Sequence, residues 1–84
     1  MKINSKFMVF GIPVDLQNQV VELEESNTIR DLLKDAEPIM GKYRTIKDIE
    51  AASFIVNNQY ISGPLSFELH EGDTVLVLMP MAGG

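Results

Sequence analysis

The sequence predicts an α+β fold, in which a mixed sheet packs against one main helix. Three observations predict it: two pairs of β-favouring stretches, a single stretch with helical periodicity between the pairs, and a strongly apolar last strand. The chain has 84 residues, 45% of them hydrophobic and 23% charged, which suits one small globular domain with a single core. From this length we expect no second domain.

The first pair of strands is predicted at 6–12 and 19–25. The first of these stretches is dense in β-favouring residues, and turn-forming residues beginning with Pro13 follow it. In the second, Val21 and Leu23 alternate with glutamates, the period of two expected of a strand with one wet face. The two stretches therefore predict a hairpin whose glutamates face solvent.

The next stretch changes to a helical period. Apolar residues at i, i+3, i+4 and i+7 gather on one face of a helix. They are Ile29, Leu32, Leu33 and Ala36. Plausible N-caps stand just before them, and Pro38 disfavours helical geometry at Glu37, so we expect the helix to stop there. A further short helix is expected near 45–49.

A second hairpin and a last strand complete the pattern. Residues 54–56 and 60–61 flank an asparagine-rich turn at 57–59, since asparagine tolerates the left-handed conformations of tight turns. Leu69 is expected to seal the core. The last strand, 74–79, is apolar at nearly every position, which predicts a central strand buried on both faces.

The simplest closure of these elements places the last strand parallel to the first, because sequential strands tend to be neighbours and parallel pairs need a long crossover. This is the β-grasp arrangement, with the helix on one face of the sheet. We expect residues 1–79 to form the β-grasp domain and residues 80–84 to form a flexible tail.

Charge and composition exclude several classes of function. The net charge of −5 opposes a nucleic-acid backbone and favours a basic patch on another protein. The absence of cysteine removes disulfides, thiolate metal ligands and thiol nucleophiles. No apolar run approaches the roughly 20 residues that span a bilayer, and no signal peptide is evident. We expect a cytoplasmic protein with no nucleic-acid or membrane partner.

Few side chains could perform chemistry. His70 is the sole histidine, in an expected loop, and no nucleophile, base and orienting acid can be assembled around it. A free-standing enzyme is therefore not expected, nor is a metal or cofactor bound by this chain. Most of the aromatic residues are expected in the core, although some could line an exposed apolar patch. They include Phe7, Phe10, Phe54 and Tyr60.

The sequence finishes with Gly83 and Gly84, close behind the apolar strand. Glycine lacks a Cβ, so the two residues would present a carboxylate on a thin, unobstructed stalk that can enter a narrow channel. A frayed end is the alternative interpretation. The residues that lead to the glycines are expected to lie against a partner's surface, where methionine adapts to irregular apolar pockets. They are Met79, Pro80, Met81 and Ala82.

Residues 54–61, 69–75 and 79–84 together resemble the MoaD/ThiS family of ubiquitin-like sulfur carriers. Pro80 followed by an apolar residue, a small residue and Gly-Gly is more similar to the molybdopterin branch of that family than to the thiamine branch. The resemblance implies a β-grasp fold and a functional state in which the Gly84 carboxyl has become a thiocarboxylate.

The resemblance also implies partners. An adenylyltransferase like the ubiquitin-activating enzymes (MoeB/ThiF-like) would use ATP to adenylate Gly84, and a desulfurase or rhodanese would supply sulfur. The acceptor would be the molybdopterin synthase large subunit, with this chain as the sulfur-carrying small subunit or co-substrate in molybdenum or tungsten cofactor synthesis. Alternatives are a sulfur carrier for thiazole synthase, a ubiquitin-like protein modifier and, from another class, a β-grasp interaction module with an inert end.

Overall fold

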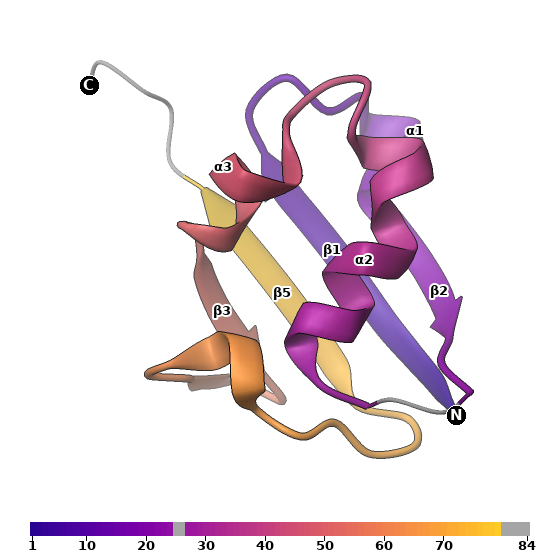
Figure 1. Ribbon diagram of the computed structural model, residues 1–84, viewed down its shortest axis with the longest axis vertical. Coiled ribbons are helices and arrows are strands. Elements are labelled where there is room, and N and C mark those ends of the chain that lie inside the picture. Colours follow the sequence, from indigo (N-terminus) through magenta and orange to yellow (C-terminus); the bar gives the residue numbers. More distant parts are fainter. Residues whose placement is uncertain (25–26, 80–84) are drawn as a thin grey trace.

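A computed structural model of the chain describes residues 1–24 and 27–79, and shows a five-stranded mixed sheet in the order β2-β1-β5-β3-β4 (Figure 1). The central strand β5 runs parallel to β1, and the other neighbouring strands are antiparallel. The predicted α+β fold with a β-grasp sheet is confirmed. The strands are β1 (Lys2–Val9), β2 (Asn18–Glu22), β3 (Ser53–Val56), β4 (Gln59–Tyr60) and β5 (Thr74–Met79).

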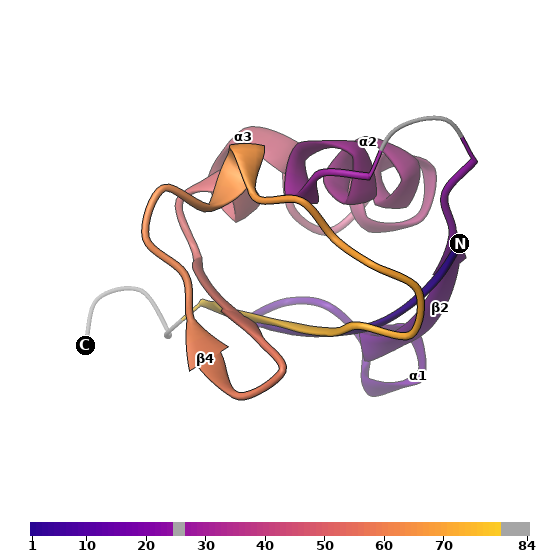
Figure 2. The same cartoon turned by 90° about the horizontal axis from the view of Figure 1, so that it is seen from below.

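The two main helices, α2 (Ile29–Met40) and α3 (Ile46–Glu50), lie on one side of the sheet (Figure 2). The short helix α1 (Val14–Gln17) and the hairpin strand β4 lie toward the other side, near opposite margins of the sheet. A 3-10 helix, η1 (Pro64–Ser66), follows β4. The sheet thus has a helix-covered face and an opposite face, here called the open face.

The first hairpin is confirmed, with different bounds. β1 begins at Lys2, because Ile3 is fully buried and the strand already pairs with β2 at Lys2. It ends at Val9, where the chain turns through Gly11 at φ +97°, and α1 fills part of the expected turn. The helix α1 has no apolar period of its own, so the sequence pattern did not reveal it.

The main helix begins as expected and ends later. Thr28 and Asp31 form a reciprocal capping box, and the predicted core positions of α2 are all buried. The expected end at Glu37 is wrong: the helix runs through Pro38 to Met40. A proline in the last turn removes only one helical N–H, and the extra turn buries Met40 completely. The predicted short helix is confirmed as α3.

The second hairpin has a tight two-residue turn. Asn57 and Asn58 have φ values of +49° and +70°, the left-handed pair that a type I′ turn requires. Gln59, expected in the turn, instead begins β4 and pairs with Val56.

The last strand is central, as predicted, but the expectation that both of its faces are buried is wrong. Val75 and Val77 are fully buried against the helices, whereas Leu76 is half-buried and Leu78 is 38% exposed. The reason is that α2 and α3 pack on one face only (Figure 2). The apolar residues of β5 therefore divide between a core and a surface.

The longest helix in the described residues is α2, with 12 residues. No helix in these two stretches is long and apolar enough to cross a membrane.

Candidate functional site at the end of the central strand

Strand β5 leads into the predicted functional residues, and it pairs with β1 on one side and β3 on the other. Its register with β1 runs from Asn4 opposite Thr74 to Val9 opposite Met79, and with β3 it reaches Leu78 opposite Ser53. Met79 is half-buried and packs against the core. A strand paired on both flanks gives the residues that follow a rigid starting point.

Large apolar side chains are exposed on the open face beside this point. Met8 and Leu78 are register partners on β1 and β5, so their side chains are neighbours on the same face. Phe10 is 55% exposed and Met8 42% exposed. We call Met8, Phe10, Leu78 and Met79 the β5-end surface. These residues, together with Val9 and Gln17, line a shallow hollow of about 300 Å³.

Polar contacts hold the Phe10 segment in place. The guanidinium Nε of Arg44 donates a hydrogen bond to the Phe10 carbonyl oxygen at 2.8 Å. The Ile12 N–H donates to the Val9 carbonyl at 3.1 Å, and the Gln17 side-chain amide donates to the Ile12 carbonyl at 3.2 Å. The exposed Phe10 ring is thus carried on a braced loop.

The structure places only one of the predicted site residues. Met79 belongs to the β5-end surface, whereas Pro80, Met81, Ala82, Gly83 and Gly84 lie outside the described residues. Sequence reasoning had not assigned Met8 or Leu78 to a site. Alternation along β1 could have found Met8, because Ile3, Phe7 and Val9 point inward and the even-numbered residues point outward.

The four aromatic residues that the sequence analysis named divide evenly between core and surface. Phe7 and Phe54 are fully buried, as expected of core residues, whereas Phe10 and Tyr60 are exposed. Phe10 and Tyr60 are thus exposed apolar residues, the lesser alternative that the sequence left open, and of the two only Phe10 belongs to the β5-end surface.

The polar residues considered from the sequence do not build a reactive site. The His70 side chain is 78% exposed, and its Nδ1 lies 3.9 Å from an Asp73 carboxylate oxygen. Glu22 and Glu24 face solvent, and Glu22 pairs with the N-terminal ammonium at 2.9 Å. In the described part of the chain, no three histidine or carboxylate side chains converge as metal ligands.

This sheet order, with its one covered face, defines the class: a ubiquitin-like β-grasp domain. The chain belongs to the ThiS family, whose family model matches residues 7–84. Membership supports the role of sulfur carrier that the sequence resemblance implied.

Two solved structures are similar along nearly the whole chain. A candidate molybdopterin converting factor subunit 1 from Pyrococcus furiosus is 27% identical, with a TM-score of 0.64, and the match covers 96% of this chain and 99% of that one. A complex of subunits 1 and 2 of molybdopterin-converting factor from Helicobacter pylori matches with 20% identity, a TM-score of 0.59 and full coverage of both chains. The second likeness shows the fold alone. No curated protein gave a significant match.

Proposed function

We propose that this protein is the sulfur-carrying small subunit of a molybdopterin synthase, with the Gly84 carboxyl as its reactive group. The observation that carries the proposal is the family match, which extends through Gly83 and Gly84 on a domain whose central strand ends five residues earlier. The likeness to the Pyrococcus furiosus protein favours the molybdopterin pathway over other uses of the same fold.

The chemistry requires activation, because a carboxylate repels nucleophiles and has no good leaving group. A partner adenylyltransferase would transfer AMP from ATP to the Gly84 carboxylate, releasing pyrophosphate. A thiol would reduce the donor's persulfide, forming a disulfide and releasing hydrosulfide. Hydrosulfide would then attack the carbonyl carbon: the C–S bond forms as the C–O bond to AMP breaks. The product is a thiocarboxylate, and the partner supplies the stabilisation of developing charge.

The β5-end surface suits the docking of a large subunit. Its exposed methionine, phenylalanine and leucine side chains lie where β5 ends, so a partner that covers them also receives the residues that follow. Complementary charge would add to this, since a chain with net charge −5 is steered toward basic surfaces. The Helicobacter pylori neighbour was solved as a complex of its two subunits, which supports testing this pairing here.

The decisive experiment is intact-mass analysis of the full chain after incubation with ATP, the cognate adenylyltransferase and a sulfide source. The proposal expects a mass gain equal to the exchange of one oxygen for sulfur, mapped to a C-terminal peptide. A variant that lacks Gly83 and Gly84 is the control and should gain no mass. An unmodified wild-type chain under conditions that modify a known carrier would contradict the proposal.

The thiazole sulfur carrier is the second candidate, favoured by the match to the ThiS family model. It uses the same activated terminus, so the mass experiment does not separate the two. Purified large subunit and purified thiazole synthase separate them when each is offered to the thiocarboxylate form together with its own sulfur-accepting substrate. The true partner is the one that transfers the sulfur to its substrate and returns Gly84 to a carboxylate. A plain interaction module would bind its partner equally well without the two glycines.

A further inference from the structure

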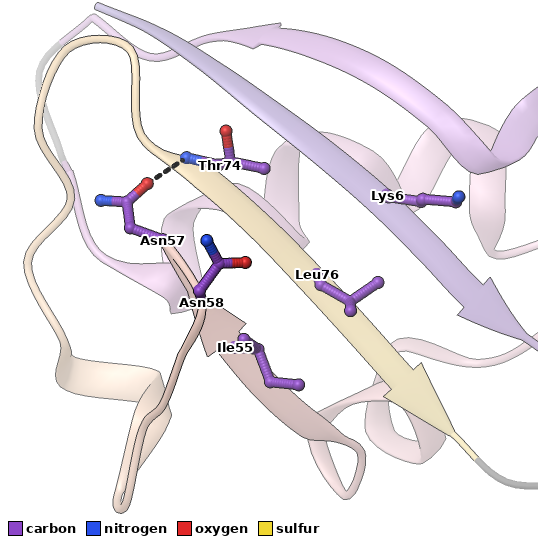
Figure 3. Close-up of a pocket in the computed structure, with 6 residues that line it drawn as sticks. All are labelled: Lys6, Ile55, Asn57, Asn58, Thr74 and Leu76. Carbon is purple, nitrogen blue, oxygen red and sulfur yellow. Dashed lines mark hydrogen bonds between the residues drawn. The ribbon is translucent and has the colours of Figure 1, made fainter.

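A second hollow lies on the open face, and Figure 3 shows its lining residues. It shares no lining residue with the hollow at the β5-end surface. Its volume is about 360 Å³. Its lining residues come from β1, β3, β5 and the turn between β3 and β4: Lys6, Ile55, Asn57, Asn58, Thr74 and Leu76. We call it the Lys6 hollow.

Strand register explains its shape. Lys6 is the partner of Leu76, and Leu76 is the partner of Ile55, so the three residues form a row across three strands. Neighbouring strands lie about 4.8 Å apart, which makes the row roughly 10 Å long. Leu76 and Ile55 are half-buried and form an apolar floor. The turn at Asn57 and Asn58 rises along one side, with Lys6 on the β1 side (Figure 3).

The polar groups around this floor favour an anion. Lys6 is the only ionisable residue in the lining, and no carboxylate in residues 1–24 and 27–79 forms an ion pair with it. The Asn57 amide is occupied, because it donates to Asp73 Oδ1 at 2.9 Å and accepts from the Thr74 N–H at 3.0 Å. No hydrogen bond within the same residues engages the Asn58 side-chain amide, so an ammonium and an amide N–H₂ remain available as donors.

Position on the sheet indicates where the anion comes from. Lys6 and Met8 are alternate residues of β1, as Leu76 and Leu78 are of β5, so the hollow lies about 6.6 Å along the strands from the β5-end surface. Met8 and Leu78 of the β5-end surface lie on the open face, as the hollow does. A protein large enough to cover the β5-end surface would therefore extend over the Lys6 hollow.

The geometry points to the Lys6 hollow as a subsite for a glutamate or aspartate side chain of the large subunit. The carboxylate would pair with Lys6 Nζ, whose flexible side chain extends away from Asn58 in Figure 3 and would turn over the hollow to meet it. The Asn58 amide would be a second donor, and the aliphatic stem of the acidic side chain would lie on Leu76 and Ile55. This inference rests on the proposed function for the identity of the partner. The chain is acidic, so most of its charges favour a basic partner surface. A contact between Lys6 and a carboxylate of the partner has the reverse polarity, and it would therefore help to fix which partner binds and in what orientation.

The test measures the affinity of the full chain for its purified cognate large subunit. Lys6→Gln removes the charge and keeps most of the stem, and should weaken binding about tenfold, as expected for loss of a partly desolvated charge pair. Asn58→Gly removes the side-chain amide, and glycine readily adopts the positive φ of this position. This variant should weaken binding by a smaller factor. Lys34→Gln, an exposed lysine on α2, is the matched control and should bind like the wild type. Thermal melts confirm that all variants are folded.

Two further measurements identify the occupant. In the wild type, salt should weaken binding by screening the Lys6–carboxylate pair. Lys6→Gln lacks this pair, so its affinity should depend less on salt concentration. A carbodiimide should couple the Lys6 amine to a large-subunit carboxylate as an amide, and mass spectrometry would name the acidic residue. A charge swap completes the test. The Lys6→Glu variant should bind poorly to the wild-type large subunit and should bind better when the cross-linked acidic residue of the large subunit is replaced by lysine.

Several outcomes would overturn the inference. Equal affinity of Lys6→Gln and Lys34→Gln would do so, as would a Lys6-dependent self-association of the wild-type chain, which would assign the hollow to a second copy. Binding of inorganic phosphate at Lys6, with no effect of Lys6→Gln on the large subunit, would assign it to a free anion. If the wild-type chain fails to bind the large subunit at all, the proposed function fails instead.

Discussion

The Asn57 side-chain amide donates a hydrogen bond to Asp73 Oδ1 at 2.9 Å, which joins the turn of the second hairpin to the turn that precedes the central strand. The other Asp73 oxygen accepts from the His70 N–H at 2.8 Å. Asn57 also accepts from the Thr74 N–H. These contacts fix the start of β5 against β3, and thereby the register that sets both the core and the open face.

Breaking this link should destabilise the domain. We expect Asp73→Ala to lower the free energy of unfolding by about 2 kcal/mol, since hydrogen bonds to a charged group are lost. Asn57→Gly keeps the positive φ available and removes only the amide. A double-mutant cycle in urea should give a coupling of about 1 kcal/mol between the two residues. Additive effects of the two substitutions would contradict a direct link.

The capping box of α2 should make stability depend on pH. The hydrogen bond from the Thr28 hydroxyl, at 2.7 Å, and that from the Thr28 N–H, at 3.0 Å, lower the pKa of Asp31 below its ordinary value. A carboxylate with a lowered pKa in the folded state contributes stability above its unfolded pKa and loses it as pH falls through the folded pKa.

Asp31→Asn should therefore cost about 1 kcal/mol at neutral pH and progressively less as acid protonates Asp31 in the wild type. Urea unfolding at a series of pH values below neutrality measures the difference. Asp35→Asn, an exposed position one turn further along the same helix, is the control. A cost for Asp31→Asn that stays constant into acid would contradict the capping role of the ionised carboxylate.

Phe7 and Phe10 provide a matched pair on β1 and the loop that follows it. Phe7 is fully buried, so Phe7→Ala should lower the free energy of unfolding by about 3–5 kcal/mol. Phe10 is mostly exposed, so Phe10→Ala should change it by about 0.5 kcal/mol or less. If the β5-end surface docks the large subunit, Phe10→Ala should still weaken that binding by about tenfold or more. Chemical denaturation and a binding titration separate the two effects.

Gly84→Ala tests the proposed reactive end directly. A methyl group beside the reacting carbon would displace it within the partner's active site, and a misplacement of about 1 Å can cost on the order of a hundredfold in rate. We expect thiocarboxylate formation, followed by intact mass over time, to slow by about that factor while the melting temperature stays unchanged. Sulfur transfer at the wild-type rate would refute the role of Gly84.

Local periodicity in the sequence determined the strands and the helices α2 and α3, although not α1. The spacing of Ile29, Leu32 and Leu33 predicted the buried face of α2, and the paired asparagines at 57 and 58 predicted a tight hairpin turn; both are confirmed. These features depend on residues a few positions apart, so a sequence pattern contains them. The family resemblance, confirmed by the match over residues 7–84, likewise rests on linear motifs.

Only the tertiary structure decided which apolar residues of the central strand are buried. Leu76 and Leu78 look in sequence like Val75 and Val77, yet they face outward because both main helices pack on one side of the sheet. Pro38 marks a local helix end, but burial of Met40 carries the helix past it. Burial depends on which distant segments cover a face, and local patterns do not contain that information. The β5-end surface and the Lys6 hollow, assembled from separate strands, are visible for the same reason only in the folded chain.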